Sequence, residues 1–184
     1  MTPRLLLVNG LPATGKTTLA LRLGALLGWP VLTKDTIKEA LFDTLGIGDR
    51  AWSKKLSGAT MELLFIWAAA TLRAGQSCVI EANFVPELDA ARLRAMAEQL
   101  PFVSVQVLCV CDGPVLRERF LARGAAGLRH VGHLDSIVIH ELTEDYWTGR
   151  LAPIPGTDAL IEADTTDFAA LDVAALARQI YEVQ

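Results

Sequence analysis

The sequence lacks any apolar run long enough to cross a lipid bilayer. Its longest uninterrupted apolar run covers residues 63–70, whereas a membrane-spanning helix needs about 20 apolar residues. We also expect no secretory leader, because the apolar stretch at residues 5–8 is too short for the hydrophobic region of a signal peptide. We therefore expect a cytoplasmic protein without a membrane partner.

Cysteine is scarce, and basic residues are outnumbered by acidic ones. The three cysteines, Cys78, Cys109 and Cys111, have no spacing typical of a zinc site or a redox pair, and their apolar neighbours favour buried core thiols. The formal net charge is −4, which argues against a surface that coats duplex nucleic acid. A nucleic-acid partner is therefore not expected.

The overall amino-acid composition is sufficient for one globular core. The chain has 184 residues, of which 52% are hydrophobic and 21% are charged, as is typical of a single ordered domain. No internal repeat, linker or low-complexity segment divides it. We expect one domain over residues 1–184.

Apolar strands alternate with helices along the chain. Runs of strand length are followed by segments whose apolar residues recur at helical spacing. The predicted strands cover residues 4–8, 30–33, 78–82, 103–110 and 159–162, and the predicted helices cover residues 16–27, 35–45, 61–72, 86–99, 115–123, 134–147 and 167–183. This alternation predicts an α/β fold of three layers, in which helices flank a five-stranded parallel sheet. The irregular segments are expected to be loops, and they cover residues 46–58, 124–133 and 149–158.

The most specific motif lies between the first strand and the first helix. Residues 10–17 read GLPATGKT and match the phosphate-loop pattern G-x-x-x-x-G-K-[ST]. The glycines let successive backbone N–H groups turn toward phosphate oxygens, and the following helix adds its positive N-terminus. We expect Lys16 to reach the β- and γ-phosphates of ATP and the Thr17 hydroxyl to ligate Mg²⁺. The predicted nucleotide-binding residues of this loop are Gly10, Ala13, Thr14, Gly15, Lys16, Thr17 and Thr18.

Other classes of phosphate-loop protein fit the chain less well. A GTPase reads its base with N-K-x-D, and the partial match at residues 33–36 lacks the Asn. Motor and AAA-type ATPases usually carry an acid pair at a strand end within a larger domain, and this chain has no such pair. The pattern favours a compact kinase with the three-layer P-loop NTPase fold.

Five segments together resemble a family of small P-loop kinases, which includes zeta-toxin-like, chloramphenicol-phosphotransferase-like and polynucleotide-kinase-like AAA-type ATP-binding proteins. The segments are GLPATGKTT at residues 10–18, TKDTIKEAL at 33–41, VIEANF at 79–84, RERFLAR at 117–123 and RHVGH at 129–133. Only the first is specific by itself, and the others count because they occur in the expected order and spacing.

The resemblance implies roles for one carboxylate and three arginines. Asp35 would accept the proton of the attacking hydroxyl, although a helix N-cap is the alternative role for this residue. Arg119 would lie near the adenine and Arg123 near the phosphates, although solvated arginines paired with Glu118 or other neighbours are the alternative. Residues 124–133 would form a short lid in which Arg129 is a second phosphate clamp.

Two polar residues mark the end of the third predicted strand. Glu81 lies in an apolar strand, where a carboxylate is costly to bury without a cation or a hydrogen-bond partner. It is the candidate to hold Mg²⁺ through a water molecule or to hold the substrate, at a position where the family more often has Asp. Asn83 follows on the same face and either contacts the substrate or forms a turn.

The roles of two histidines and of four large apolar residues stay open. His130 and His133 are three residues apart, which suits a metal site, substrate binding or simple exposure. Trp52, Met61, Phe65 and Trp67 either line an acceptor pocket or pack in the core.

We conclude from the sequence that the chain is an ATP- and Mg²⁺-dependent kinase that phosphorylates a hydroxyl of a small molecule. The acceptor would be a nucleoside, a sugar or an antibiotic-like alcohol. The alternative is an ATP-binding switch that acts through a protein partner. Neither the acceptor nor the oligomeric state follows from the sequence.

Overall fold

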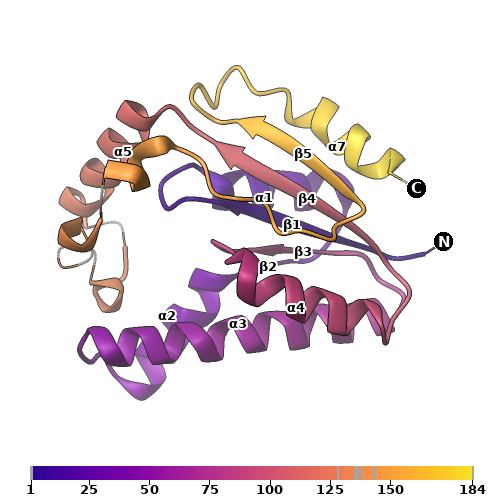
Figure 1. Cartoon of the computed structure of the whole chain (residues 1–184), viewed down its shortest axis with the longest axis horizontal. Helices are drawn as coiled ribbons and strands as arrows, with labels where there is room; N and C mark the ends of the chain where they lie inside the picture. The colour runs from indigo at the N-terminus through magenta and orange to yellow at the C-terminus, as the bar shows by residue number, and fades with distance from the viewer. Residues whose placement is uncertain (1, 128, 135–136, 138, 143, 184) are drawn as a thin grey trace.

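A five-stranded parallel sheet forms the centre of the molecule (Figure 1). The computed structural model describes residues 2–183 except 128, 135, 136, 138 and 143. The strand order is β2-β3-β1-β4-β5, and all pairings are parallel. The strands are β1 (Arg4–Gly10), β2 (Val31–Thr33), β3 (Cys78–Glu81), β4 (Val103–Val110) and β5 (Ala159–Asp164). The predicted α/β fold and its five strands are confirmed.

Helices cover both faces of the sheet. Helices α1 and α7 share one hydrophobic core with the sheet, and α3 and α4 share the other, which makes three layers (Figure 1). The helices are α1 (Lys16–Leu27), α2 (Lys34–Leu45), α3 (Arg50–Arg73), α4 (Pro86–Ala97), α5 (Gly113–Ala125) and α7 (Val173–Glu182). Short 3₁₀ turns follow α5, namely η1 (Val131–His133), η2 (Ile139–Glu141) and η3 (Glu144–Thr148).

Strand β1 is apolar throughout because it is buried on both sides. Leu5 and Leu7 pack against α3 and α4, whereas Leu6 and Val8 pack against α1 and α7. All four side chains are fully buried. Side chains alternate between the two faces of a strand, so a strand covered on both faces must be apolar at every position.

Polar side chains determine where α2 and α3 begin. Thr33 caps α2, because its Oγ1 accepts a hydrogen bond from the Thr36 N–H at 3.1 Å. The alternative cap role of Asp35 is therefore wrong, and its carboxylate is free for another contact. Asp49 caps α3 by accepting from the Trp52 N–H at 2.8 Å. Because α3 starts at Arg50, most of the predicted loop 46–58 is helical.

Two helices predicted in the second half of the chain differ in the structure: one is replaced by short turns, and the other begins later. The described part of residues 134–147 contains the turns η2 and η3 instead of one continuous helix, and Leu134 has a left-handed backbone with φ of 57°. The last helix begins at Val173 instead of residue 167, because the Asp172 side chain caps it by accepting from the Ala175 N–H.

The predicted lid overlaps the end of α5. Gly124 and Ala125 belong to the last turn of that helix, and the described residues that follow include η1. Residue 128 of the predicted lid lies outside the described residues. The lid therefore begins as the continuation of a helix, and its first two predicted residues are helical.

The sheet brings the candidate site residues to one edge. The chain passes from β1 to β2 and β3 on one side of β1, and then to β4 and β5 on the other side. Ligands of open parallel sheets bind at the carboxyl ends of the strands where this change of direction leaves a crevice. The phosphate loop follows β1 and lies at that point.

All three cysteines are buried and free, as expected for core thiols. Among the described residues, no helix combines the length and the apolar character that crossing a membrane requires.

At two glycines within helices, an added methyl group should have opposite effects on the free energy of unfolding. A Cβ at Gly24 in α1 would overlap Val31 Cγ2 and lie 3.0 Å from the Trp29 carbonyl oxygen, whereas a Cβ at Gly58 in α3 would meet no atom within 4 Å. Gly24→Ala should lower the free energy of unfolding by about 1–3 kcal/mol through overpacking. Gly58→Ala should raise it by about 0.5–1 kcal/mol through helix propensity. Urea denaturation measures both, and equal effects of the two substitutions would contradict the packing argument.

Candidate active site

The phosphate loop has the backbone geometry of an anion-binding turn. Gly15 adopts φ of 83° and Ala13 adopts φ of 70°, so two residues of the loop are left-handed. A Cβ at Gly10 would lie 2.8 Å from Thr14 Oγ1, so the loop closes tightly on itself. No side chain caps the N-terminus of α1 at Gly15. The amides of the first helical turn are thus available to phosphate oxygens.

Three side chains meet beneath this loop. Lys16 Nζ lies 3.6 Å from Glu81 Oε1, and the Thr17 hydroxyl donates to Glu81 Oε2 at 3.0 Å. The register of β1 and β3 places Val8 opposite Glu81, which brings the end of β3 next to the loop. A threonine hydroxyl beside a carboxylate offers the oxygen ligands that Mg²⁺ prefers.

Glu81 is a buried charge that depends on its partners. Its side chain is 3% exposed. Burial raises the pKa of Glu81 above its ordinary value, while the Lys16 ammonium and the hydrogen bond from Thr17 oppose that shift. The structure therefore brings together the loop lysine, the loop threonine and the strand carboxylate that the sequence predicted separately.

Asp35 is paired with an arginine of the predicted lid. Its Oδ2 accepts from Arg129 Nη2 at 3.0 Å. Burial raises the pKa of Asp35, but the positive charges of Arg129, Lys16 and Lys34 outweigh it, so that the pKa lies below its ordinary value. Asp35 is thus an ionised carboxylate that faces the predicted lid.

Two histidines of the predicted lid extend this contact along α2. His133 Nε2 lies 3.0 Å from Glu39 Oε1, and His130 Nε2 lies 3.1 Å from Asp43 Oδ1. Burial lowers the pKa of His133 to about 3, so this imidazole is neutral at neutral pH. Within the described part of the chain, no cluster of His, Cys, Asp and Glu side chains is suited to hold a metal ion. In the structure the two histidines join residues 130–133 to α2.

One cavity connects the phosphate loop, Asp35 and the arginines. It has a volume of about 440 Å³. The predicted site residues that line it are Ala13, Gly15, Lys16, Thr17, Thr18, Asp35, Arg119, Arg123 and Arg129. The predicted residues Gly10, Thr14 and Glu81 are instead buried behind it, where Thr14 Oγ1 donates to the Leu11 carbonyl.

Arg119 and Arg123 extend from one helix toward this cavity. Arg119 donates from Nη1 and Nη2 to the carbonyl oxygens of Thr165 and Thr166, at 2.9 and 2.8 Å. Its guanidinium is therefore fixed against the segment that follows β5. The Arg123 guanidinium lies over the Phe120 ring, 5.4 Å from its centroid.

Two lysines of α2 were missed in the sequence analysis. Lys34 Nζ donates to Asn83 Oδ1 at 3.0 Å, and burial lowers the pKa of Lys34. Lys38 Nζ donates to Ser53 Oγ at 3.0 Å, and burial lowers its pKa to about 8. Their spacing of four residues, on either side of Asp35, was the available signal, because it places both on one helix face.

Asn9 was also missed, although it immediately precedes the phosphate loop. Its Oδ1 accepts from the Gly10 N–H at 2.8 Å and from the Phe84 N–H at 3.0 Å, and its Nδ2 donates to Gln106 Oε1. Gln106 in turn bonds both backbone groups of Ile154. This buried network ties the loop to the segment that contains Asn83.

The apolar residues suggested for an acceptor pocket mostly pack elsewhere. Met61 and Phe65 are buried in the core beneath the sheet, and Trp67 packs against the same core. The Trp52 indole N–H donates to the Gly46 carbonyl oxygen. The core-packing alternative therefore holds for the three residues on the inner part of α3.

The sequence matches one known family over most of its length. Residues 5–154 match the family model AAA_33, which describes an AAA domain. No protein of curated function matches the sequence at a significant level.

Three of the many solved structures with a similar fold illustrate it. A protein of Chloroflexus aurantiacus J-10-fl, described provisionally as a kinase, is 37% identical with a TM-score of 0.89, and 100% of each chain is covered. Mycobacterium tuberculosis APS kinase in complex with AMPPNP and APS is 15% identical with a TM-score of 0.62, covering 98% of this chain and 96% of its own. A sugar kinase of Janibacter sp. HTCC2649 is 15% identical with a TM-score of 0.59, covering 100% and 94%. The last two similarities show the fold alone.

Removal of the Asn9 side chain should destabilise the protein. Asn9→Ala leaves the buried amides of Gly10 and Phe84 without their acceptor, at a cost of about 1–3 kcal/mol for each unsatisfied group. The free energy of unfolding from urea denaturation measures this loss. Gln99→Ala removes an exposed amide and serves as the control. Equal stability of the two variants would contradict the structural role of Asn9.

Proposed function

The chain belongs to the AAA_33 family of AAA domains, and from this membership and the site geometry we propose that it is an ATP- and Mg²⁺-dependent kinase. Its reaction transfers the γ-phosphoryl group of ATP to a hydroxyl of a small molecule, such as a nucleoside, a sugar or an antibiotic-like alcohol. The similarity to a protein described provisionally as a kinase, at 37% identity over both chains, supports this proposal.

The observation that carries the proposal is the position of a carboxylate opposite the phosphate loop. Asp35 and the loop residues Lys16 and Thr17 line the same cavity. A protein that only binds nucleotide needs the loop but has no need of a base across from it. Phosphoryl transfer needs both, because the attacking hydroxyl must be oriented and must lose its proton.

Asp35 would orient the acceptor and take its proton. The acceptor oxygen attacks the γ-phosphorus, the bond to the bridging oxygen breaks, and the electron pair of that bond leaves with ADP. The proton of the hydroxyl passes to an Asp35 carboxylate oxygen. A low pKa suits this role, because an ionised carboxylate is ready to accept and the loose transition state requires orientation more than a strong base.

Cations around the cavity would stabilise the charge that develops on the transferred group. Lys16 lines the cavity from the loop, Arg123 lines it from α5, and Arg129 lines it from the predicted lid. Thr17 and Glu81 fit a Mg²⁺ ion, because their oxygens lie 3.0 Å apart beside the loop. When bound there, Mg²⁺ supplies charge neutralisation to the β- and γ-phosphates.

An ATP-dependent switch remains the second candidate, and one observation favours it. The contacts of Arg129, His130 and His133 with α2 link the predicted lid directly to the carboxylate beside the phosphate loop. Nucleotide binding that displaced Arg129 would therefore change the surface of the lid. The two functions are separated by incubating the protein with Mg²⁺-ATP and pooled hydroxyl compounds, because only a kinase yields products heavier by one phosphoryl group.

Asp35→Asn should lower kcat by about 10²–10⁴ because the proton acceptor is lost. The affinity for AMPPNP, measured by calorimetry, should change little, since Lys16 and the loop amides remain. Asp43→Asn is the matched control, because Asp43 lies on the same helix and contacts His130. An Asp35→Asn enzyme with the turnover of the parent would remove the assignment of Asp35 as the base.

Glu81→Gln should raise the Mg²⁺ concentration needed for half-maximal activity by about 10–100-fold, the effect expected when a group that orients a metal ligand is lost. ADP release measured across a Mg²⁺ titration tests this expectation. Glu87→Gln, at an exposed position at the start of α4, is the control. An unchanged Mg²⁺ requirement in Glu81→Gln would exclude Glu81 from the metal site.

A further inference from the structure

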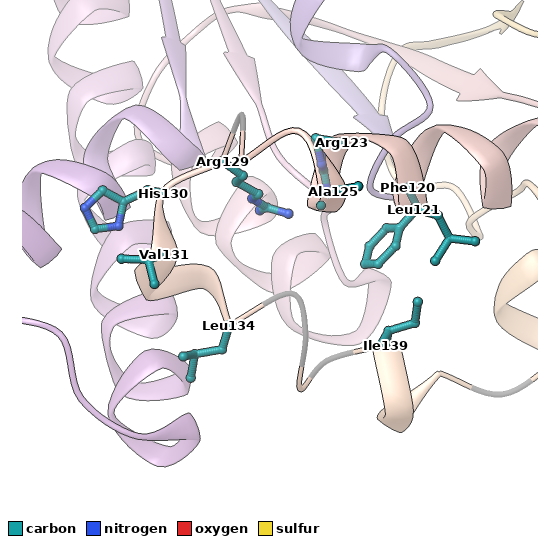
Figure 2. Close-up of a pocket in the computed structure, with 11 residues that line it drawn as sticks. Phe120, Leu121, Arg123, Ala125, Arg129, His130, Val131, Leu134 and Ile139 are labelled. Atoms are coloured by element: carbon teal, nitrogen blue, oxygen red, sulfur yellow. The ribbon is translucent and has the colours of Figure 1, made fainter.

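A second cavity lies beside the phosphate site. It has a volume of about 450 Å³, which is within the range of small-molecule sites. The C-terminal half of α5 forms one side of it, and the other side is formed by Arg129, His130, Val131, Leu134 and Ile139 (Figure 2). Most of its wall is apolar, and the apolar side chains that line it are Phe120, Leu121, Ala125, Val131, Leu134 and Ile139.

Val131 is held in this wall by the residues on either side of it. The His130 ring stacks on the Phe42 ring with centroids 5.3 Å apart. Gly132 lies so close to the same ring that a Cβ would be 2.6 Å from it. Because both neighbours pack on α2, Val131 lines the cavity while 68% exposed. Because the backbone at Val131 is fixed in this way, the cavity wall is already formed before any ligand binds.

The apolar cavity and the phosphate cavity share two side chains. Arg123 and Arg129 line both of them, and in Figure 2 both extend from the upper wall of the apolar cavity. Arg129 also contacts Asp35 at 3.0 Å. A ligand in the apolar cavity would therefore lie beside the two arginines that also line the phosphate cavity, one of which contacts the proposed base.

We propose that the apolar cavity binds the body of the phosphoryl acceptor, so that the acceptor is an alcohol with an apolar or aromatic body and not a polyol. This proposal rests on the proposed function and specifies its acceptor. The body fills the apolar cavity, and the hydroxyl extends past the arginines toward Asp35. The extra hydroxyls of a polyol would lose their water against this wall without gaining hydrogen-bond partners.

Two alcohols of different polarity test the proposal. The protein is incubated with Mg²⁺-ATP and either 3-phenyl-1-propanol or xylitol, and ADP release and product mass are measured. We expect kcat/KM for 3-phenyl-1-propanol to exceed that for xylitol by at least about tenfold. A higher kcat/KM for xylitol would overturn the proposal and leave the kinase function standing.

Variants of the cavity wall connect this preference to the structure. Val131→Asp places a carboxylate in the apolar wall and should lower kcat/KM for 3-phenyl-1-propanol by at least about tenfold. The affinity for AMPPNP should stay unchanged. The matched control is Leu88→Asp, because Leu88 is a 60% exposed apolar residue on α4 that does not line the cavity. Ala125→Trp fills the same cavity without a charge and should have the effect of Val131→Asp, which keeps the test valid if one variant folds poorly.

Direct binding separates the remaining outcomes. Saturation-transfer NMR should detect 3-phenyl-1-propanol on the parent protein and on Leu88→Asp, and not on Val131→Asp or Ala125→Trp. Binding without any phosphorylated product, from this or any pooled alcohol, would overturn the acceptor role together with the kinase function. Absence of binding would overturn the cavity assignment. A dimer of the parent protein, detected by sedimentation, that the Val131→Asp substitution dissociates would also overturn the cavity assignment. The apolar wall would then be an interface between two copies of the chain.

Discussion

The buried carboxylate of Glu81 is the constraint on which the rest of the site depends. A charge with 3% exposure is stable only beside a cation and hydrogen-bond donors. Lys16 and Thr17 supply these, and they are also the two loop residues that a nucleotide and its Mg²⁺ would engage. The pairing of β1 with β3 fixes the distance between them. The pairing of β1 with β3 and the phosphate loop therefore depend on each other. Strand β3 buries the Glu81 carboxylate, and the loop residues Lys16 and Thr17 supply the cation and the hydrogen bond that this carboxylate needs.

Helix α2 carries two rows of charged side chains, one of which links this centre to the predicted lid. Its acids, Asp35, Glu39 and Asp43, are spaced four residues apart and contact Arg129, His133 and His130. Its lysines, Lys34 and Lys38, are directed toward Asn83 and Ser53. One helix thus holds the proposed base, the lid and the side chain of Asn83. The position of the lid and the charge state of Asp35 are consequently coupled.

Prediction from the sequence succeeded where the signal was local. It failed where contacts between distant segments determine the structure. The GLPATGKT loop and the five apolar strands follow from patterns within short windows, and the structure has both. The short turns in place of helix 134–147 do not follow from such patterns. The apolar cavity is lined by α5 and the segment that follows it instead of α3, and three of the four residues suggested for an acceptor pocket, Met61, Phe65 and Trp67, pack in or against the core.

The sequence alone determined the α/β class, the phosphate loop and the polar residues that end the third predicted strand, because periodicity and spacing record local backbone geometry. It also placed Lys16, Thr17, Asp35, Glu81 and the arginines among the candidates. Only the tertiary structure decided which of them meet. Glu81 lies 64 residues from Thr17 along the chain, and Arg129 lies 94 residues from Asp35. Contacts over such separations depend on strand order and helix packing, which no local pattern encodes.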